Sequence, residues 1–353
     1  MSAPRSICLL RLSAIGDTCN AAAVVHAIRQ HYPEAEITWV IGKAEAALMA
    51  GMDGVNFVVF DKKQGMAAYR NLRRQLQGKQ FDALLLMQVA LRANLASLCI
   101  SAKRRIGYDK AKSKELHSLF INERVEPTDK VHVLDNFRQF QKSLGIPLEA
   151  PAWNIPVNAK DRDWAKTQLD PGTRKHLIIT PAASNAERNW LPERYAAVAD
   201  HAASRGFSVY LCGGPADHEK QLAANIQAHA KHSLHNLVGQ SSLKQLFALI
   251  GEASLVLAPD TGPAHMAVAA GTPVIGLYAH SNPKRTGPYL WQNYVVDAYT
   301  PALKQMRGET PEQSRWGQRL KGKELMENIT TEHVIDMLER CIQENVFCLS
   351  HLL

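Results

Sequence analysis

Long apolar runs are missing from this sequence of 353 residues. A helix that crosses a bilayer needs ~18–20 consecutive apolar residues, and no stretch of the sequence reaches that length. The apolar stretch near the beginning is soon interrupted by Asp17 and Asn20, so we expect a strand there and not a signal peptide. The composition excludes a membrane-spanning helix within these residues.

Paired cysteine motifs are also missing. The six cysteines are scattered, and no two of them form a CxxC pair. Zinc sites and disulfide frameworks depend on such spacings, so we expect neither. Reduced thiols in the cytoplasm fit this pattern best.

Two nucleotide-binding fingerprints are absent as well. No GxGxxG follows a predicted strand, and no GxxxxGK(S/T) occurs anywhere. The first motif is typical of dinucleotide-binding folds and the second of P-loop enzymes. Their absence argues against an NAD-dependent oxidoreductase and against P-loop phosphoryl transfer.

The net charge of +8 is concentrated in one part of the chain. Between Asp61 and Glu115 there are thirteen Lys and Arg residues against four Asp and Glu, so the remainder is close to neutral. A basic face of this kind attracts phosphates, anionic membranes or nucleic acid, and a solvated surface is the alternative interpretation. A nucleic-acid adaptor would interleave aromatic residues with the basic ones, yet this stretch holds only Tyr69, Phe81 and Tyr108.

Strand and helix patterns alternate along the first half of the chain. Apolar runs predict strands at 7–12, 35–42, 55–60 and 81–87, and helical patterns follow at 18–32, 43–52, 66–77 and 91–100. Continuous apolar runs are typical of buried parallel strands. Their alternation with helices predicts a parallel sheet with both faces covered.

A proline-rich stretch at 145–161 interrupts this pattern, and the alternation then restarts. The second half predicts strands at 176–182, 207–214, 235–239, 254–260 and 272–279, the last of which should close the sheet, and a final helix at 330–346. We therefore predict an α/β protein with two doubly wound, Rossmann-like domains that face each other across a cleft. In such sheets ligands bind beyond the carboxyl ends of the strands.

The turn LAPDTGPAH, near residue 260, has the features of a phosphate site. Asp260 ends a strand, Thr261 and Gly262 bring backbone N–H groups to a helix start, and His265 lies just inside the helix. Unpaired N–H groups and the helix dipole attract anions there. A capped helix, with Asp260 as its cap, is the structural alternative.

Neighbouring turns support a nucleotide site. Ser184 and Arg188 follow the strand at 176–182, and Glu219 follows the glycine pair of CGGPADHEK. A hydroxyl and a guanidinium suit phosphate oxygens, whereas an acid after a glycine-rich turn suits ribose hydroxyls.

Three motifs together resemble one family. RLSAIGD near the beginning, DTGPAH, and GLYAHSNPKRTGPY at 276–289 look like the ADP-heptose:lipopolysaccharide heptosyltransferases of glycosyltransferase family nine. The resemblance covers nearly the whole chain. The stretch RRIGYDKAKSKE at 104–115 is most similar to the heptosyltransferase I type, which adds the first heptose.

The resemblance implies a GT-B fold with residues 1–155 as the acceptor domain, 156–329 as the nucleotide-sugar domain, and 330–353 as a helix that crosses back to the first domain. It implies transfer of L-glycero-D-manno-heptose from ADP-heptose to a Kdo residue of the lipid A core, with inversion. Asp17 matches the proposed catalytic base. The family's donor contacts fall on Ser184, Arg188, Glu219, Asp260, Thr261, Gly262 and His265.

Asp17 has a second interpretation, because Asp is a common cap and a helix predicted to start at Thr18 would use one there. Ser13 and Gly16 share its turn, and we assign them to the acceptor site. Basic residues near predicted strand ends are further acceptor candidates, although solvated surface charge explains each equally well: Lys62, Lys63, Arg92, Lys103, Arg104 and Arg105.

The expected partners follow from this assignment. They are ADP-heptose, Kdo-lipid A and an anionic inner-membrane surface, which Arg70, Arg73 and Arg74 would contact from the cytoplasmic side. No metal is expected, since no acidic pair stands beside a phosphate turn. No nucleic acid and no cofactor are expected either, and family habit favours a monomer. Transfer to a heptose acceptor (type II or III) and a GT-B nucleotide-sugar epimerase are the alternatives.

Overall fold

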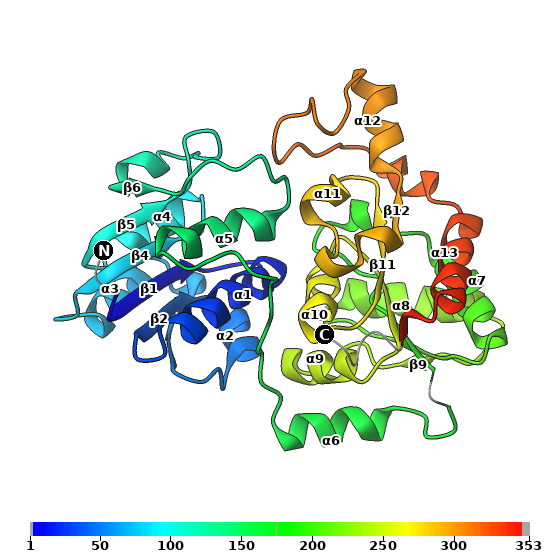
Figure 1. Ribbon diagram of the computed structural model, residues 1–353. Helices are drawn as coiled ribbons and strands as arrows, with labels where there is room; N and C mark the ends of the chain where they lie inside the picture. The colour runs from blue at the N-terminus through cyan, green and yellow to red at the C-terminus, as the bar shows by residue number, and fades with distance from the viewer. Residues whose placement is uncertain (1–2, 174, 348–353) are drawn as a thin grey trace. The chain divides into compact units, whose positions relative to one another are not determined.

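The computed structural model describes residues 3–173 and 175–347, and the chain divides into two compact units after Pro156. Each unit contains one six-stranded sheet in which every strand pair is parallel. Helices flank both sheets (Figure 1). The predicted α/β class and the two Rossmann-like domains are confirmed.

The first unit alternates strands with helices. Its strands are β1 (Ser6–Arg11), β2 (Glu36–Ile41), β3 (Val55–Val59), β4 (Phe81–Leu86), β5 (Ala102–Gly107) and β6 (Glu123–Arg124). Its helices are α1 (Ile15–His31), α2 (Lys43–Met49), α3 (Met66–Gln75), α4 (Leu91–Ser97) and α5 (Val133–Ser143), with the short 3-10 turns η1 (Lys62–Gln64) and η2 (His117–Leu119).

The second unit repeats this plan with additions near its end. Its strands are β7 (His176–Ile179), β8 (Ser208–Leu211), β9 (His235–Asn236), β10 (Leu255–Pro259), β11 (Val274–Tyr278) and β12 (Val295–Asp297). Its helices are α6 (Ala159–Gln168), α7 (Pro192–Ser204), α8 (Asp217–His229), α9 (Leu243–Gly251), α10 (Gly262–Ala270), α11 (Pro283–Thr286), α12 (Tyr299–Arg307) and α13 (Thr331–Gln343), with 3-10 turns η3 (Ala186–Arg188), η4 (Tyr289–Tyr294) and η5 (Lys323–Asn328).

Both sheets have the strand order of a Rossmann fold. The first runs β3-β2-β1-β4-β5-β6, and the second runs β12-β11-β10-β7-β8-β9, which is the same order read from the other edge. The order reverses between β1 and β4 and between β7 and β10. Crevices at such reversals are where this fold binds ligands.

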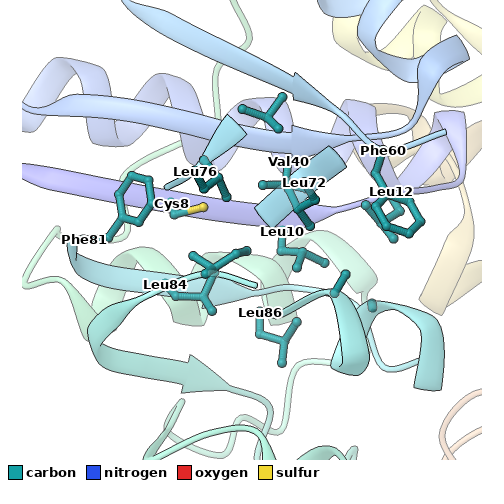
Figure 2. Close-up of a cluster of buried hydrophobic side chains, with 14 of the residues drawn as sticks. Cys8, Leu10, Leu12, Val40, Phe60, Leu72, Leu76, Phe81, Leu84 and Leu86 are labelled. Atoms are coloured by element: carbon teal, nitrogen blue, oxygen red, sulfur yellow. The ribbon is translucent and has the colours of Figure 1, made fainter. Parts of the chain in front are cut away.

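One face of the first sheet packs on α3 and α4 (Figure 2). Alternate residues of β1, among them Cys8 and Leu10, are fully buried against Leu72 of α3 and Leu84 of β4. Side chains alternate between the faces of a strand, so the intervening Leu9 faces the opposite layer. Burial on both faces explains the uninterrupted apolar runs in the sequence.

Several element boundaries differ from the sequence predictions. Helix α1 begins at Ile15, three residues before the predicted start, and α6 begins inside the predicted linker, where the Asn158 side chain accepts from the Asp161 N–H at 2.8 Å. The segment 272–279 does not close its sheet, because β12 pairs beyond β11. β12 has three residues, too few for a strand pattern to stand out in the sequence.

Helix α13 packs against α7, β11 and β12 of the second unit. The predicted return to the first domain stays a prediction, and residues 348–353 lie outside the described part of the chain. No helix among the described residues combines the length and apolarity that a membrane crossing requires. The five cysteines described are unpaired.

His117 is buried in the first unit, and its ring is hydrogen-bonded on both sides. Nε2 accepts from the Tyr108 N–H at 3.2 Å, so Nδ1 carries the proton that Asn94 Oδ1 accepts at 3.0 Å. Burial, together with the positive charge of Arg124, lowers the pKa of His117 to about 4. The folded protein therefore keeps this ring neutral where the unfolded chain protonates it.

We predict that replacing His117 by Gln reduces the acid sensitivity of the fold. Between the unfolded pKa of about 6.5 and the folded one, the unfolded state binds the extra proton, so stability falls as the pH falls. Between pH 7.5 and pH 5 the wild type should lose about 2 kcal/mol more free energy of unfolding than His117→Gln. Urea unfolding at both pH values measures this, with exposed His31→Gln as the control; equal losses in wild type and His117→Gln would contradict it.

Candidate active site

A pocket of about 560 Å³ lies at the carboxyl ends of β1 to β4 in the first unit. Its lining includes Ser13 after β1, Lys62 and Lys63 after β3, and Arg92 in α4. The sequence predicted all four as acceptor residues, and the structure brings them together. The pocket adjoins the reversal of strand order between β1 and β4, where a ligand is expected in this fold.

Gln88 ties the two central strands together at this pocket. Its Oε1 accepts from the Leu12 N–H at 2.7 Å, and its Nε2 donates to Ser13 Oγ at 3.4 Å. The side-chain amide thus bridges the chain ends of β1 and β4. The sequence interpretation missed Gln88, which directly follows a predicted strand.

Glu45 is a carboxyl group that the sequence interpretation also missed. It lines the pocket and is only 8% exposed. Gly42 leaves room for it, because a Cβ at that position would collide with the Leu12 carbonyl and the Glu45 carboxylate. Burial raises the pKa of Glu45, and the charges of Lys62 and Arg11 act in the opposite direction. Glu45 is therefore neutral over a wider pH range than an exposed glutamate.

Asp17 lies in the first turn of α1 and forms an ion pair with Arg11 at the end of β1. The helix begins with Ala14 at its cap position and no side-chain capping bond, so the interpretation of Asp17 as a cap is wrong. Arg11 also donates to the Met87 carbonyl at 2.6 Å and lies over the Phe137 ring. These contacts hold the Asp17 carboxylate, whose side chain is 35% exposed.

Other predicted acceptor residues are not at this pocket. Arg104 pairs with Glu123 at 2.6 Å, and Arg105 donates to the carbonyls of Ile100 and Phe120 at 2.8 Å each. Both guanidinium groups thus bind β5 to its surroundings. Gly16 is buried within α1.

Lys103 also has an internal partner, since its ammonium group pairs with Asp82 at the amino end of β4. Like Arg104 and Arg105, it belongs to β5 and does not line the pocket described above.

In the second unit, the turns after β7 and β10 meet through one guanidinium group. Arg188 Nη1 donates to the Asp260 carbonyl at 2.8 Å and lies 3.3 Å from Asp260 Oδ2, while Nη2 donates to Ser184 Oγ at 2.8 Å. Ser281 Oγ donates to the same Asp260 oxygen at 2.6 Å. Ser184, Arg188 and Asp260, all predicted to bind the sugar nucleotide, therefore form one network. Ser281 also belongs to it, although the sequence interpretation did not single it out.

The network lies beside the N-terminus of α10, which starts at Gly262. Thr261 holds the cap position without a side-chain capping bond. Within the described residues, Thr261 Oγ1 and Arg188 Nε are buried and lack a hydrogen-bond partner. The first N–H groups of a helix also have no partner inside the helix. The start of α10 thus has several unpaired hydrogen-bond donors that an anionic ligand could accept from.

Two further predicted donor residues lie close to glycines or inside the helix. Glu219 Oε2 accepts from the Gly214 N–H at 2.6 Å, and a Cβ at Gly213 would lie 2.8 Å from the same oxygen. The glycine pair is therefore needed for the Glu219 carboxylate to fold back onto its turn. His265 is 9% exposed in the first turns of α10.

Across residues 3–173 and 175–347, no group of three or more His, Cys, Asp or Glu side chains is arranged to hold a metal ion. The donors at the second turn are instead N–H, hydroxyl and guanidinium groups, which suit a diphosphate.

Comparison with known proteins agrees with this geometry. The model of glycosyltransferase family 9 (heptosyltransferase) matches residues 69–315. The chain is 42% identical over 338 residues to the lipopolysaccharide core heptosyltransferase OpsX of Haemophilus influenzae, an alignment that covers 96% of this chain and 97% of that protein.

Solved structures show the same fold at low sequence identity. A glycosyl transferase family 9 structure from Veillonella parvula has a TM-score of 0.79 at 20% identity, covering 96% of this chain and 97% of that one. The Escherichia coli heptosyltransferase WaaC with ADP has a TM-score of 0.74 at 19% identity, covering 95% and 99%. The expected GT-B fold is confirmed, and the chain belongs to glycosyltransferase family 9, the heptosyltransferases.

Proposed function

We propose that this heptosyltransferase moves L-glycero-D-manno-heptose from ADP-heptose to a Kdo residue of the lipopolysaccharide inner core, with inversion and without a metal ion. The extent of identity with a lipopolysaccharide core heptosyltransferase supports the substrate class. The observation that carries the proposal is the set of donors at the start of α10, where Thr261 Oγ1 and Arg188 Nε are buried without partners among the described residues.

The second unit binds the donor in this proposal. Its diphosphate accepts hydrogen bonds from the N–H groups at Thr261 and Gly262 and from Arg188, while Ser184 and His265 add further polar contacts. Asp260, held by Ser281 and Arg188, accepts from a heptose hydroxyl. Glu219 accepts from the ribose hydroxyls.

The first unit binds the acceptor. Kdo carries a carboxylate, and the pocket lined by Lys62, Lys63 and Arg92 offers cations to it. Asp17 takes the proton of the acceptor hydroxyl. The hydroxyl oxygen then bonds to the anomeric carbon of the heptose as the bond from that carbon to ADP breaks. A positioned general base contributes typically ~10²–10⁴-fold to the rate.

Fixed donors supply the second requirement of this displacement. Negative charge builds on the departing diphosphate, and N–H groups and a guanidinium that are already oriented stabilise it without reorganisation. Because Arg188 is held by Asp260 and Ser184, its charge is positioned before the donor arrives. These groups would therefore stabilise the charge on the leaving diphosphate in place of a bound metal ion.

Mass spectrometry of truncated lipid A cores tests donor and acceptor together. Incubation with ADP-heptose should add one heptose to cores that end in Kdo. A core that already carries heptose should gain none. Gain only on the heptose-bearing core would indicate type II or III transfer, and product formed from ADP-heptose without any acceptor would indicate an epimerase.

Replacing Asp17 by Asn should leave ADP-heptose binding unchanged and reduce kcat by about 10²–10⁴-fold, since the amide cannot accept the proton. Calorimetric titration of the donor and the mass-spectrometric assay measure the two effects. Asp53→Asn, at an exposed turn, is the matched control. Near-normal turnover of Asp17→Asn would exclude Asp17 as the base.

Replacing Gly262 by Val should weaken donor binding at least about tenfold, because a branched side chain blocks approach to the helix N-terminus. Acceptor KM should change little. The control is Gly251→Val at the end of α9, where an added Cβ meets nothing within 4 Å. Equal donor affinities in the two variants would contradict the proposed diphosphate site.

Acceptor binding in the pocket lined by Lys62, Lys63 and Arg92 should also depend on the ionisation of Glu45, which lies in the same pocket. As the pH rises through its raised pKa, the pocket gains a negative charge that repels an anionic acceptor. Acceptor KM should therefore rise with pH in the wild type. In Glu45→Gln the rise should be smaller, which steady-state kinetics between pH 5 and pH 8 would reveal; identical KM profiles would refute this role of the pocket.

A further inference from the structure

Five leucines of the first unit are exposed on two neighbouring segments. Helix α4 carries Leu91 and Leu95, and Leu98 is its C-cap residue, with exposures of 47%, 40% and 66%. Leu116, which precedes the turn η2, and Leu119, which ends it, are exposed by 65% and 76%. The first three leucines are spaced i, i+4 and i+7, and the cap residue Leu98 keeps helical backbone angles, so they line one face of the helix. The opposite face buries Ala93 and Ala96 in the core.

Hydrogen bonds join the two segments into one surface. The Glu115 carboxylate accepts from the Leu91 N–H, and the Glu115 carbonyl accepts from Asn94 Nδ2 at 2.8 Å. His117 Nδ1 donates to Asn94 Oδ1 at 3.0 Å. The turn with Leu116 and Leu119 is thereby fixed next to α4. We call these five leucines the leucine face.

Single exposed apolar residues are ordinary, whereas a contiguous group marks a contact surface. Nothing in the core requires the leucines of α4 to be apolar, since the buried side of that helix consists of small residues. Water contact of this apolar area is unfavourable. The leucine face therefore indicates a partner with an apolar surface.

The charges around the leucine face indicate which partner this is. Arg92 on α4 and Lys110 and Lys114 in the loop after β5 are exposed, whereas Lys112 pairs with Asp109 inside that loop. Glu115 is the exposed acid at the border, and its carboxylate accepts from α4. Apolar side chains with a cationic border match the acyl region and the head groups of an anionic bilayer.

The leucine face also adjoins the acceptor pocket. Ala90 and Arg92, which line that pocket, flank Leu91 in the chain. We propose that the leucine face docks on an anionic phospholipid bilayer, so that the sugar of a lipid-linked acceptor in that bilayer enters the neighbouring pocket. This inference rests on the proposed function for the nature of the acceptor, but the docking itself does not.

Helix α3 is the competing surface, because Arg70, Arg73 and Arg74 were the sequence-based candidates for membrane contact. These arginines are exposed, but the apolar residues Ala68 and Leu72 of α3 are buried in the core. The large apolar residue that α3 exposes is Met66, at 73%, whereas the leucine face offers five leucines that can insert between lipids. The leucine face therefore dominates binding.

Vesicle sedimentation of the full chain tests the proposal. The triple variant Leu95→Gln, Leu98→Gln and Leu116→Gln should bind vesicles of phosphatidylglycerol and phosphatidylethanolamine at least about tenfold more weakly than wild type. The matched control is Leu148→Gln with Met306→Gln, two residues exposed by 43% and 52% elsewhere, which should bind like wild type. A second comparison, Arg70→Gln with Arg73→Gln and Arg74→Gln, should lose less than the leucine variant.

A gain of signal provides an independent readout. Leu98→Trp should show a blue-shifted emission relative to wild type when these vesicles are added, and brominated lipids should quench it. Unchanged emission, or equal vesicle binding by wild type and the triple variant, would overturn the proposal. So would a triple variant that loses self-association in sedimentation velocity while retaining vesicle binding, because the face would then contact a second copy of the chain.

Two activity measurements separate this inference from the proposed function. With a soluble Kdo acceptor that lacks acyl chains, the triple variant should transfer heptose like wild type. With an acceptor embedded in vesicles, its rate should fall. If wild type transfers heptose to neither acceptor, the proposed function fails, and the vesicle-binding result still decides whether the leucine face docks on lipid.

Discussion

In a parallel sheet every strand ends at the same edge, and the strand order decides which turns at that edge have room for a ligand. Here the order reverses between β1 and β4 and again between β7 and β10. The connections on the two sides of each reversal leave toward opposite faces, so the turns at the centre diverge and open a crevice. In the first unit this crevice is extended into a pocket, and in the second it holds the turns joined by Arg188.

Each reversal also contains an arginine paired with an aspartate. Arg11 pairs with Asp17 in the first unit, and Arg188 pairs with Asp260 in the second. In both units the arginine also donates to a backbone carbonyl of a neighbouring central turn, which is Met87 for Arg11 and Asp260 for Arg188. Charge-assisted bonds of this kind are strong and directional. Each pair therefore fixes a carboxylate and the backbone of a strand end at the same time.

The sequence predicted the repeated parts of the fold well, since buried parallel strands are continuous apolar runs that stand out from their surroundings. It failed where an element is short or charged. β12 has three residues and shows no strand pattern. For β5 the sequence predicts only a short strand at 106–108, whereas the strand begins at Ala102 and includes three consecutive cations, Lys103, Arg104 and Arg105. The second-unit donor residues were predictable because Asp260, Thr261 and Gly262 follow a strand and begin a helix.

The first-unit site was predictable only in part. Ser13 is predicted because it shares the turn of Asp17, and Lys62 and Lys63 because they follow a strand. The same rule applies to Gln88 and Glu45, but neither is a cation, the type of side chain that an anionic acceptor favours. In the sequence, Arg104 and Arg105 could not be distinguished from pocket cations such as Lys62. Only the fold shows that their guanidinium groups bind Glu123 and backbone carbonyls. The leucine face was not predictable, because exposure depends on packing that residue spacing does not specify.

The side chain of Thr261 also affects the stability of the fold. Threonine is a good helix cap, and a cap bond is typically worth ~1 kcal/mol, yet its hydroxyl makes no such bond to α10. The hydroxyl oxygen is buried and makes no hydrogen bond within the described residues, which is a cost to the fold that a ligand could remove. A diphosphate bound there, as proposed, would satisfy this oxygen and stabilise the folded chain more as its concentration rises, so resistance to heat and proteolysis would report donor binding directly.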